Sequence, residues 1–143
     1  MRNSPPDMTA RLKKASLRAT FQRAALLSAL VKAGKPLTAL ELAGIAAGKA
    51  DLATVYRSLA VFERKGLVRR VDLRQNGAAF EYEDPSHHHH HVICTRCGRI
   101  EAIGRCDFGA LKRSAIASTG FSRVTGHAIE LFGICAPCSK RAS

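Results

Sequence analysis

Apolar residues recur at helical spacing in three stretches of the first half of the chain. The first stretch, residues 21–31, follows Thr20, which can cap a helix, and precedes Gly34, which can end one. Its predicted buried face carries Phe21, Ala24, Leu27 and Val31. We therefore expect a first amphipathic helix here.

Two more helices are predicted downstream. Residues 38–41, Thr-Ala-Leu-Glu, form a capping box that opens a short helix to about Ala47. Asp51 can cap a third helix over residues 52–65, and Gly66 stops it. The predicted buried stripe of this third helix consists of Leu52, Val55, Leu59 and Phe62.

The pattern then changes to strand alternation. Residues 67–73 alternate in polarity, Asn76-Gly77 supplies a tight turn, and residues 79–82 return as a second strand. Three helices followed by a hairpin describe a winged helix-turn-helix, in which the third helix enters the major groove of DNA. The side chains that this helix would offer to DNA are Thr54, Tyr56 and Arg57. The alternative is a core tyrosine beside a solvated arginine.

Charge supports a nucleic-acid partner. Basic residues outnumber acidic ones by 15 to 6 in residues 1–82, but only by 8 to 5 in residues 83–143. A positive first half indicates a polyanion, although such charge can also serve solubility alone. Residues 1–10 are predicted to be a flexible tail. Lys13, Lys14 and Arg18 follow, and they can reach DNA phosphates or form a solvated helix face.

The second half opens with a predicted hinge, residues 83–87, and a run of five histidines, residues 87–91. The run continues through two apolar residues into Cys94, most simply as a strand. Because side chains alternate across a strand, His89 and His91 share one face, and His88 and His90 share the other. One segment can thus supply two metal sites.

One helix and further strands complete the predicted fold. Strands are expected over residues 99–103, 121–124 and 127–132, and a helix capped by Asp107 runs from Phe108 to about Ser118. The predicted class is α+β. Its parts are the tail (1–10), a winged-helix domain (11–82), the hinge (83–87) and a small metal-binding α/β domain (88–143).

The cysteines predict a structural zinc site. Four of the five form two Cys-x-x-Cys pairs, Cys94/Cys97 and Cys135/Cys138. No secretory leader or membrane span is visible, so we expect a cytoplasmic chain whose reduced thiols bind metal. Four thiolates suit tetrahedral Zn²⁺, one ion per subunit. The alternative, a redox-active pair, would need a thioredoxin-like context.

The histidines predict a second, regulatory divalent metal. Imidazoles with carboxylates suit Zn²⁺, Fe²⁺ or Mn²⁺. The alternative is a solvated low-complexity tract. The nearby side chains that can complete the ligand shells are Glu81, Glu83, Glu101, Cys106 and Asp107. Cys106 alone is ambiguous, since it can be a small buried hydrophobe, a ligand or a free thiol.

Several of these motifs together resemble the ferric uptake regulator family of bacterial metalloregulators. The matching stretches are residues 17–23, Leu52-Ala53-Thr54-Val55-Tyr56-Arg57-Ser58-Leu59, residues 66–68, 80–81, 87–98, 126–127, 130–133 and the Cys135/Cys138 pair. The resemblance covers nearly all of residues 12–138. It implies a homodimeric repressor that binds AT-rich palindromic operators when loaded with metal.

The resemblance also implies residue roles. It places Tyr56 and Arg57 on DNA with Arg18 near the minor groove, and it makes the four paired cysteines zinc ligands. It implies a hinge sensor site of Glu81, His89 and His91. A second site, in a dimerisation domain, would consist of His88, His90 and His127.

Three positions depart from the family pattern. Pro36 stands where iron-type members donate a histidine, and Arg69 stands where zinc-type members often use an aspartate. Gly109 occupies the place of a glutamate that usually completes the second site. The sequence therefore leaves the sensed metal open.

Two other functions are compatible with a chain that binds metal. One is a metal-storage or chaperone protein, and the other is a zinc-dependent hydrolase. A hydrolase would need an open zinc position and a general base, and no His-Glu-x-x-His helix is present to supply them. We therefore expect no enzyme activity, no small-molecule substrate and no membrane partner.

Overall fold

The computed structural model describes residues 5–45, 50–84, 89–104 and 106–141. Contacts divide the chain into two compact units, residues 1–85 and residues 86–143. The boundary falls within the segment that the sequence suggests as a hinge. One part of that segment is ordered with the first unit, because the N–H of Glu83 donates to the carbonyl oxygen of Leu67 at 2.9 Å.

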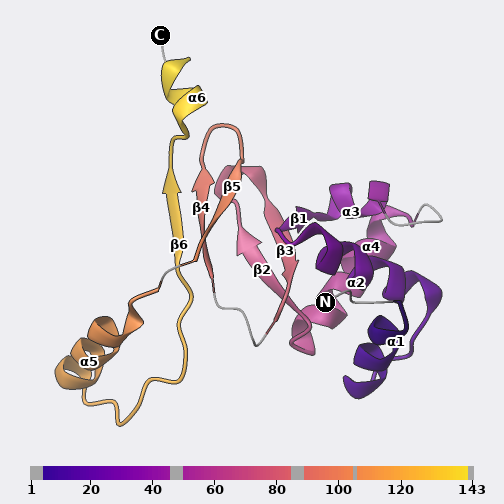
Figure 1. Cartoon of the computed structure of the whole chain (residues 1–143), viewed down its shortest axis with the longest axis horizontal. Coiled ribbons are helices and arrows are strands. Elements are labelled where there is room, and N and C mark those ends of the chain that lie inside the picture. The colour runs from indigo at the N-terminus through magenta and orange to yellow at the C-terminus, as the bar shows by residue number, and fades with distance from the viewer. Residues whose placement is uncertain (1–4, 46–49, 85–88, 105, 142–143) are drawn as a thin grey trace. The chain divides into compact units, whose positions relative to one another are not determined.

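The first unit consists of helices and a small antiparallel sheet (Figure 1). Its helices are α1 (Pro5–Lys14), α2 (Phe21–Ala33), α3 (Ala39–Ile45) and α4 (Leu52–Arg64). Its strands are β1 (Leu37–Thr38), β2 (Val68–Asp72) and β3 (Ala78–Tyr82), in the order β1-β3-β2. A 3-10 turn, η1 (Arg74–Asn76), joins β2 to β3. The last three of these helices, followed by the β2–β3 hairpin, give the predicted winged-helix arrangement.

The N-terminal segment corrects the predicted flexible tail. From residue 5 onward the chain is helical, and Met8 and Leu12 of α1 are buried in the core of the first unit. Their spacing of four residues puts both on one helix face, which packs against α2. Two apolar residues among polar ones are a weak signal, and for this reason the sequence alone gave no helix here.

The predicted capping groups form in the first unit, whereas Asp107 makes no side-chain cap hydrogen bond at the start of the helix Phe108–Thr119. Thr20 accepts a hydrogen bond from the N–H of Arg23 at 3.2 Å at the start of α2. The Thr38–Glu41 capping box is reciprocal, with N···O distances of 2.8 Å and 3.1 Å. Gly34 ends α2 with a φ of 60°, in the left-handed region that glycine enters at little cost. Local sequence thus sets where these helices begin and end.

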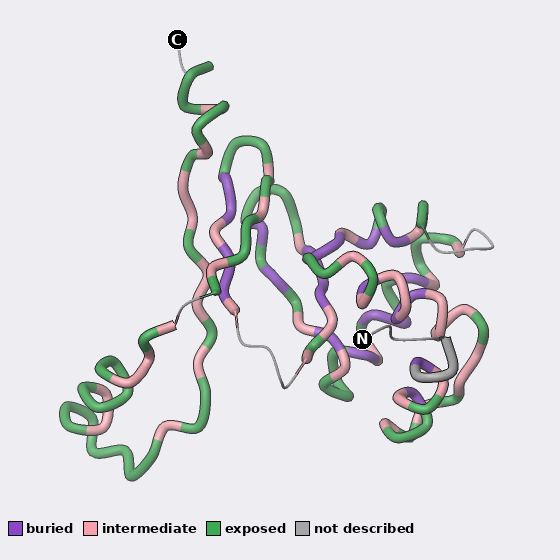
Figure 2. Tube along the Cα trace, in the orientation of Figure 1, coloured by how far each residue is buried: buried purple, intermediate pink, exposed green. Residues whose placement is uncertain are grey.

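The predicted buried faces are partly wrong. Phe21 and Leu52 are 77% and 41% exposed, because each is the first residue of its helix and lies beyond the packed region. The core of α2 is formed one to two turns later by Leu26, Leu27 and Leu30. In α4 the predicted residues Val55, Leu59 and Phe62 are all fully buried. Figure 2 shows the resulting buried stretches in purple.

The second unit is built on strand β4. Its strands are β4 (His90–Cys94), β5 (Ile100–Ile103) and β6 (Glu130–Gly133), in the order β5-β4-β6. β5 pairs antiparallel with β4, while β6 pairs parallel with it after a crossover that contains α5 (Phe108–Thr119). A short helix, α6 (Ala136–Lys140), ends the described chain. The fold of the whole chain is α+β, as predicted.

Two predicted strands of the second unit are corrected. Residues 121–124 form no strand, and the expected strand 127–132 begins only at Glu130. A strand needs a hydrogen-bonded neighbour, and β4 pairs with residues 130–133 alone on that side. His127 therefore lies in the segment before β6, not on a sheet face. No helix in the described parts of the chain is long and apolar enough to cross a membrane.

Candidate metal centres and nucleic-acid interface

A hydrogen-bonded chain of side chains organises the start of α4. Asp51 Oδ1 accepts from the N–H of Thr54 at 2.8 Å, and the Thr54 hydroxyl donates to Asp51 Oδ2 at 2.9 Å. Arg57 Nη2 in turn donates to Thr54 Oγ1 at 3.0 Å. These bonds hold the pKa of Asp51 below its usual value, with the backbone N–H of Thr54 as the largest cause. The cap thus fixes Arg57 on the exposed side of the first two turns.

Tyr56 lies on the same solvent-facing side of α4. It is 54% exposed, which rules out the alternative of a core tyrosine. A groove between this face and the β2–β3 hairpin is lined by Tyr56, Arg70 and Arg74, and also by the carboxylates of Glu63 and Asp72. Arg70 and Arg74 were not singled out from the sequence, although their place in a predicted wing was a usable signal. An aromatic ring and three guanidinium groups here suit a nucleic-acid surface.

The upstream basic residues are solvent-facing as well. Lys13 and Lys14 lie in the last turn of α1, and Arg18 precedes α2; all three are exposed. The carbonyl oxygen of Arg18 accepts a hydrogen bond from Arg23 Nη1 at 3.1 Å, which fixes the backbone there. Exposure makes these side chains available to phosphate, but it is equally compatible with a solvated face.

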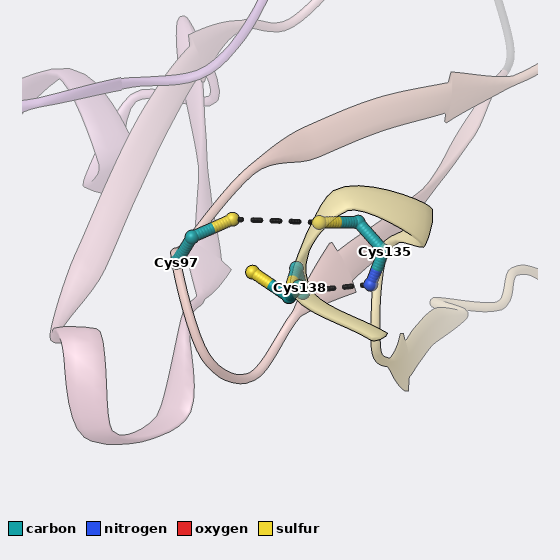
Figure 3. Close-up of side chains that lie close together, drawn as sticks. Cys97, Cys135 and Cys138 are labelled. Atoms are coloured by element: carbon teal, nitrogen blue, oxygen red, sulfur yellow. Dashed lines mark hydrogen bonds between the residues drawn. The ribbon is translucent and has the colours of Figure 1, made fainter. Parts of the chain in front are cut away.

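Four cysteines converge in the second unit. Cys94 ends β4, Cys97 follows in the next turn, and Cys135 and Cys138 flank and enter α6 (Figure 3). Parallel pairing of β4 with β6 brings the two Cys-x-x-Cys pairs together, and all four sulfurs lie within 4.8 Å of one another. The Cys97 and Cys135 sulfurs are 3.7 Å apart, too far for a disulfide. Tetrahedral Zn–S bonds of about 2.3 Å require a sulfur separation of roughly 3.8 Å, so the geometry fits zinc.

The local electrostatics distinguish the thiols. The N–H of Cys135 donates to Cys94 Sγ at 3.4 Å, and this bond with one from Cys97 lowers the pKa of Cys94 to about 6. The pKa of Cys138 is raised to about 12, chiefly by its hydrogen bond with Cys135 and then by burial. The pKa values of Cys94 and Cys138 therefore move in opposite directions, and the two thiols do not ionise together. A dication that four thiolates share removes this conflict.

A second cluster joins His90, Cys106 and His127. The Nε2 atoms of His90 and His127 are 3.0 Å apart, and Cys106 Sγ lies 3.0 Å from His127 Nε2. The ring of Phe108 stacks on His127 with a centroid separation of 3.8 Å and an interplanar angle of 16°. The structure thus brings together two predicted ligands and one of the alternatives, Cys106. His88, the third histidine assigned to this site, lies outside the described residues.

His89 and His91 lie together, as strand alternation predicts. Their ring centroids are 5.1 Å apart in an edge-to-face arrangement, and His91 is only 1% exposed. His90, between them in sequence, instead contacts His127. The histidine run therefore divides into two groups within the second unit.

The carboxylates that the sequence offers as further metal ligands differ in the residues that they contact. Glu81 is buried in β3 and is ion-paired with Arg69, its cross-strand partner in β2. Glu83 Oε2 lies 3.9 Å from Arg69 Nε. Glu101 is exposed and pairs with Arg99 at 2.8 Å, and Asp107 precedes α5. Neither Glu101 nor Asp107 joins a metal-capable group among the described residues.

The chain matches the model of one protein family over most of its length. The ferric uptake regulator family model covers residues 14–132. The chain belongs to this family. It is therefore a metal-responsive transcriptional regulator whose partners are duplex DNA and a second copy of the chain.

Individual relatives of the ferric uptake regulator family agree with this assignment. The chain is 34% identical over 133 residues to the peroxide operon regulator of Bacillus subtilis, covering 91% of this chain and 90% of that one. It is 36% identical over 133 residues to the ferric uptake regulation protein of Bordetella parapertussis, covering 90% and 94%. The crystal structure of the Vibrio cholerae ferric uptake regulator superposes with a TM-score of 0.75 at 31% identity, covering 89% and 98%.

These relatives leave the regulator's subtype open, since a peroxide regulator and an iron regulator match almost equally well. The family assignment made from the sequence is confirmed. The departures from the family pattern remain in the structure: Pro36 is a buried residue without a ligand atom, and Gly109 lies in the first turn of α5. The shells of the histidine sites must be completed by other residues.

Proposed function

We propose that this chain is a homodimeric repressor of metal-uptake or metal- and oxidative-stress genes, which binds AT-rich palindromic operators in its metal-loaded form. The observation that carries the proposal is the combination of two features in one chain. The first unit has an exposed, hydrogen-bonded Asp51–Thr54–Arg57 chain at the start of a helix. The second unit has converging cysteine and histidine donors. A helix cap serves any helical protein, but an exposed arginine held beside it in a chain with separate metal donors favours a DNA-binding regulator over a storage protein or a hydrolase.

The DNA contacts in this proposal come from α4 and its surroundings. Arg57 donates to a guanine or a phosphate, and Tyr56 packs on a thymine methyl group. Thr54 orients Arg57 through the 3.0 Å hydrogen bond between them. Lys13, Lys14 and Arg18 add phosphate contacts, with Arg18 toward the minor groove. The exposure of Tyr56, of the two lysines and of both arginines supports the assignment, and Thr54 is half-buried beside them.

Cys94, Cys97, Cys135 and Cys138 hold one structural Zn²⁺ in this proposal. The 3.7 Å sulfur separation and the parallel β4–β6 pairing support it. The four residues connect the central strand to the C-terminal helix, which otherwise has no buried residue of its own. We therefore assign the ion to folding of the second unit and not to sensing.

The labile sensor site in this proposal consists of Glu81, His89 and His91. The proximity of the two rings and the burial of His91 support the histidine pair. Glu81 comes from the first unit, so its participation rests on the family resemblance. Its carboxylate is engaged with Arg69, which must share or release it when a cation binds. Glu83, 3.9 Å from Arg69, can take over that partner.

A ligand set drawn from both units explains how the regulator would switch. Glu81 and the two histidines would hold the metal, which would tie the first unit to the second. A ligand changes DNA affinity only by favouring one arrangement of the domains over another. Two recognition helices of a dimer must fit half-sites about 34–36 Å apart, or a multiple of that spacing, on one face of DNA. A hinge that metal fixes in one conformation can keep the two helices at this spacing. A flexible hinge does not keep the spacing, so the dimer binds DNA more weakly.

The proposal further places the protein in the cytoplasm, where its DNA target is, and gives it no catalytic role. Its test is selection of duplexes from a random DNA pool by the metal-loaded protein. The expected result is enrichment of an AT-rich palindrome that binds two protein chains. Recovery of unrelated sequences bound equally well, or binding by one chain, would overturn the proposed operator type and stoichiometry.

A further inference from the structure

The cluster of His90, Cys106 and His127 has a donor set unlike that of the proposed sensor site. It combines two imidazoles with a thiol, whereas the sensor site has no sulfur. We propose that this cluster is a mixed nitrogen–sulfur metal site, completed by the Cys106 thiolate, and that it prefers Zn²⁺ or Co²⁺ to Mn²⁺ or Mg²⁺. The inference rests on the proposed metal-binding function of the chain, and it names the ligand and the metal class of one site.

Distances around His127 support a shared ion. Its Nε2 lies 3.0 Å from both His90 Nε2 and Cys106 Sγ. A neutral ring nitrogen carries either one hydrogen or one lone pair, so a single hydrogen bond does not satisfy both neighbours. With Zn–N bonds of about 2.0 Å and a Zn–S bond of about 2.3 Å, tetrahedral ligands lie roughly 3.3–3.5 Å apart. An ion among the three donors therefore needs only a small outward movement of each side chain.

The surroundings hold the ligands in place. His90 is 3% exposed in the central strand, and the Phe108 ring stacks on His127. Cys106 and His127 are only half-buried, so one side of the cluster is open to a fourth ligand such as water. Two fixed rings and one accessible side are features of a preorganised site that still exchanges its metal.

The nearby carboxylates do not provide an alternative third ligand. Glu101 is engaged with Arg99, and Gly109 in the first turn of α5 has no side chain that could donate to a metal. Cys106 precedes α5 and brings its sulfur to the position where a third donor is needed. A thiolate with two imidazoles favours Zn²⁺ and Co²⁺, while Mn²⁺ and Mg²⁺ prefer oxygen ligands. The cysteine therefore sets the metal preference of this site.

Cobalt spectroscopy tests the inference without DNA. Protein that retains one chelator-resistant zinc per chain is titrated with Co²⁺, and absorption is recorded in the near-ultraviolet and visible regions. We expect a thiolate-to-cobalt charge-transfer band in the natural protein and loss of that band in Cys106→Ser. Cys106→Asp, which keeps a ligand atom at this position, should still bind cobalt there but should also lack the band. Zinc content, measured alongside, shows that the four-cysteine site is intact in each variant.

Two results would overturn the inference. One is the absence of a charge-transfer band in the natural protein, and the other is a band of undiminished strength in Cys106→Ser. Either result would leave metal-dependent DNA binding untouched, because that is measured separately. If Cys106→Ser gives the same cobalt spectrum as the natural protein while chelation still abolishes DNA binding, the sulfur ligand is wrong and the proposed function stands.

Discussion

Single side chains connect the fold of this regulator to its proposed chemistry. Asp51 caps α4 and also orients Thr54, which accepts the hydrogen bond from Arg57. One carboxylate thus stabilises the helix and positions the guanidinium that we propose to contact DNA. Arg69 and Glu81 combine roles in a similar way, because their ion pair joins two strands and engages a candidate metal ligand.

Replacing Asp51 by alanine should lower the melting temperature by a few degrees at neutral pH, since the cap to Thr54 is lost. The pKa of Asp51 is held below its ordinary 3.8, so its contribution is complete above that pH and is lost as pH falls through the lowered value. The difference between the two proteins should therefore disappear in acid. Asp51→Asn, which keeps the capping oxygen without the charge, is the matched control. A difference that persists in strong acid would mean that the charged cap is not the cause.

Arg69→Ala should destabilise the metal-free first unit by about 3 kcal/mol, because it leaves the Glu81 carboxylate, 6% exposed, without its main counter-charge. Glu81→Ala in the same background should recover part of that loss. Denaturant unfolding of the four proteins gives a double-mutant cycle, and we expect a coupling of about 1–3 kcal/mol. A coupling near zero would show that Glu83 replaces Glu81 as the partner of Arg69 without cost.

At the scale of elements, α4 and β4 organise the two units. The inner face of α4 supplies three fully buried residues to the core, which leaves its outer face exposed for the DNA contact that we propose. Strand β4 divides the histidine run between two groups and ends at Cys94. In each element, the 3.6-residue or two-residue period sets which residues share a face.

Arg57→Ala should weaken DNA binding and reduce the steepness of its salt dependence by about one unit on a log–log plot, if Arg57 contacts phosphate. Arg64→Ala, at the other end of the same helix, is the matched control and should leave affinity within about twofold. Fluorescence anisotropy over a series of salt concentrations measures both. Equal losses in the two variants would indicate general electrostatic attraction, not a contact by α4.

Local signals made much of the fold predictable. Thr20, Gly34 and Asp51 mark helix ends through short-range hydrogen bonds or backbone preference, and these are readable from sequence. The secondary-structure predictions failed where tertiary packing determines whether a segment is a helix or a strand. Helix α1 depends on burying Met8 and Leu12 against α2, and residues 121–129 lack a strand neighbour. For the sites, the paired cysteines have fixed spacing, whereas the role of Cys106 depends on a contact across 21 residues of sequence.

At the scale of the whole molecule, we propose different tasks for different metals. In this proposal the four-cysteine ion holds the second unit together, and the histidine sites respond to metal supply. The apolar residues Leu111, Phe121, Leu131 and Ile134 are exposed in the second unit of a single chain. A second copy of the chain, the partner expected for this family, is the natural cover for such surface.

Extraction of the structural zinc should unfold the second unit, since structural zinc contributes about 10–16 kcal/mol to folding in small domains. Hydrogen exchange is the measurement: amides of β4 and β6 should lose protection, while those of α4 should keep it. Cys138→Ser should have the same effect without a chelator. Unchanged protection in β4 and β6 would show that the cysteines are not needed for folding.

The central claim is that labile metal controls DNA binding by a chain whose fold is already complete. Its direct test is the affinity for a selected palindromic duplex before and after removal of the labile metal, with the cysteine-bound zinc retained. The account predicts a loss of about tenfold or more on removal, reversed when metal is added back. Equal affinity in both states, with the fold intact, would contradict it.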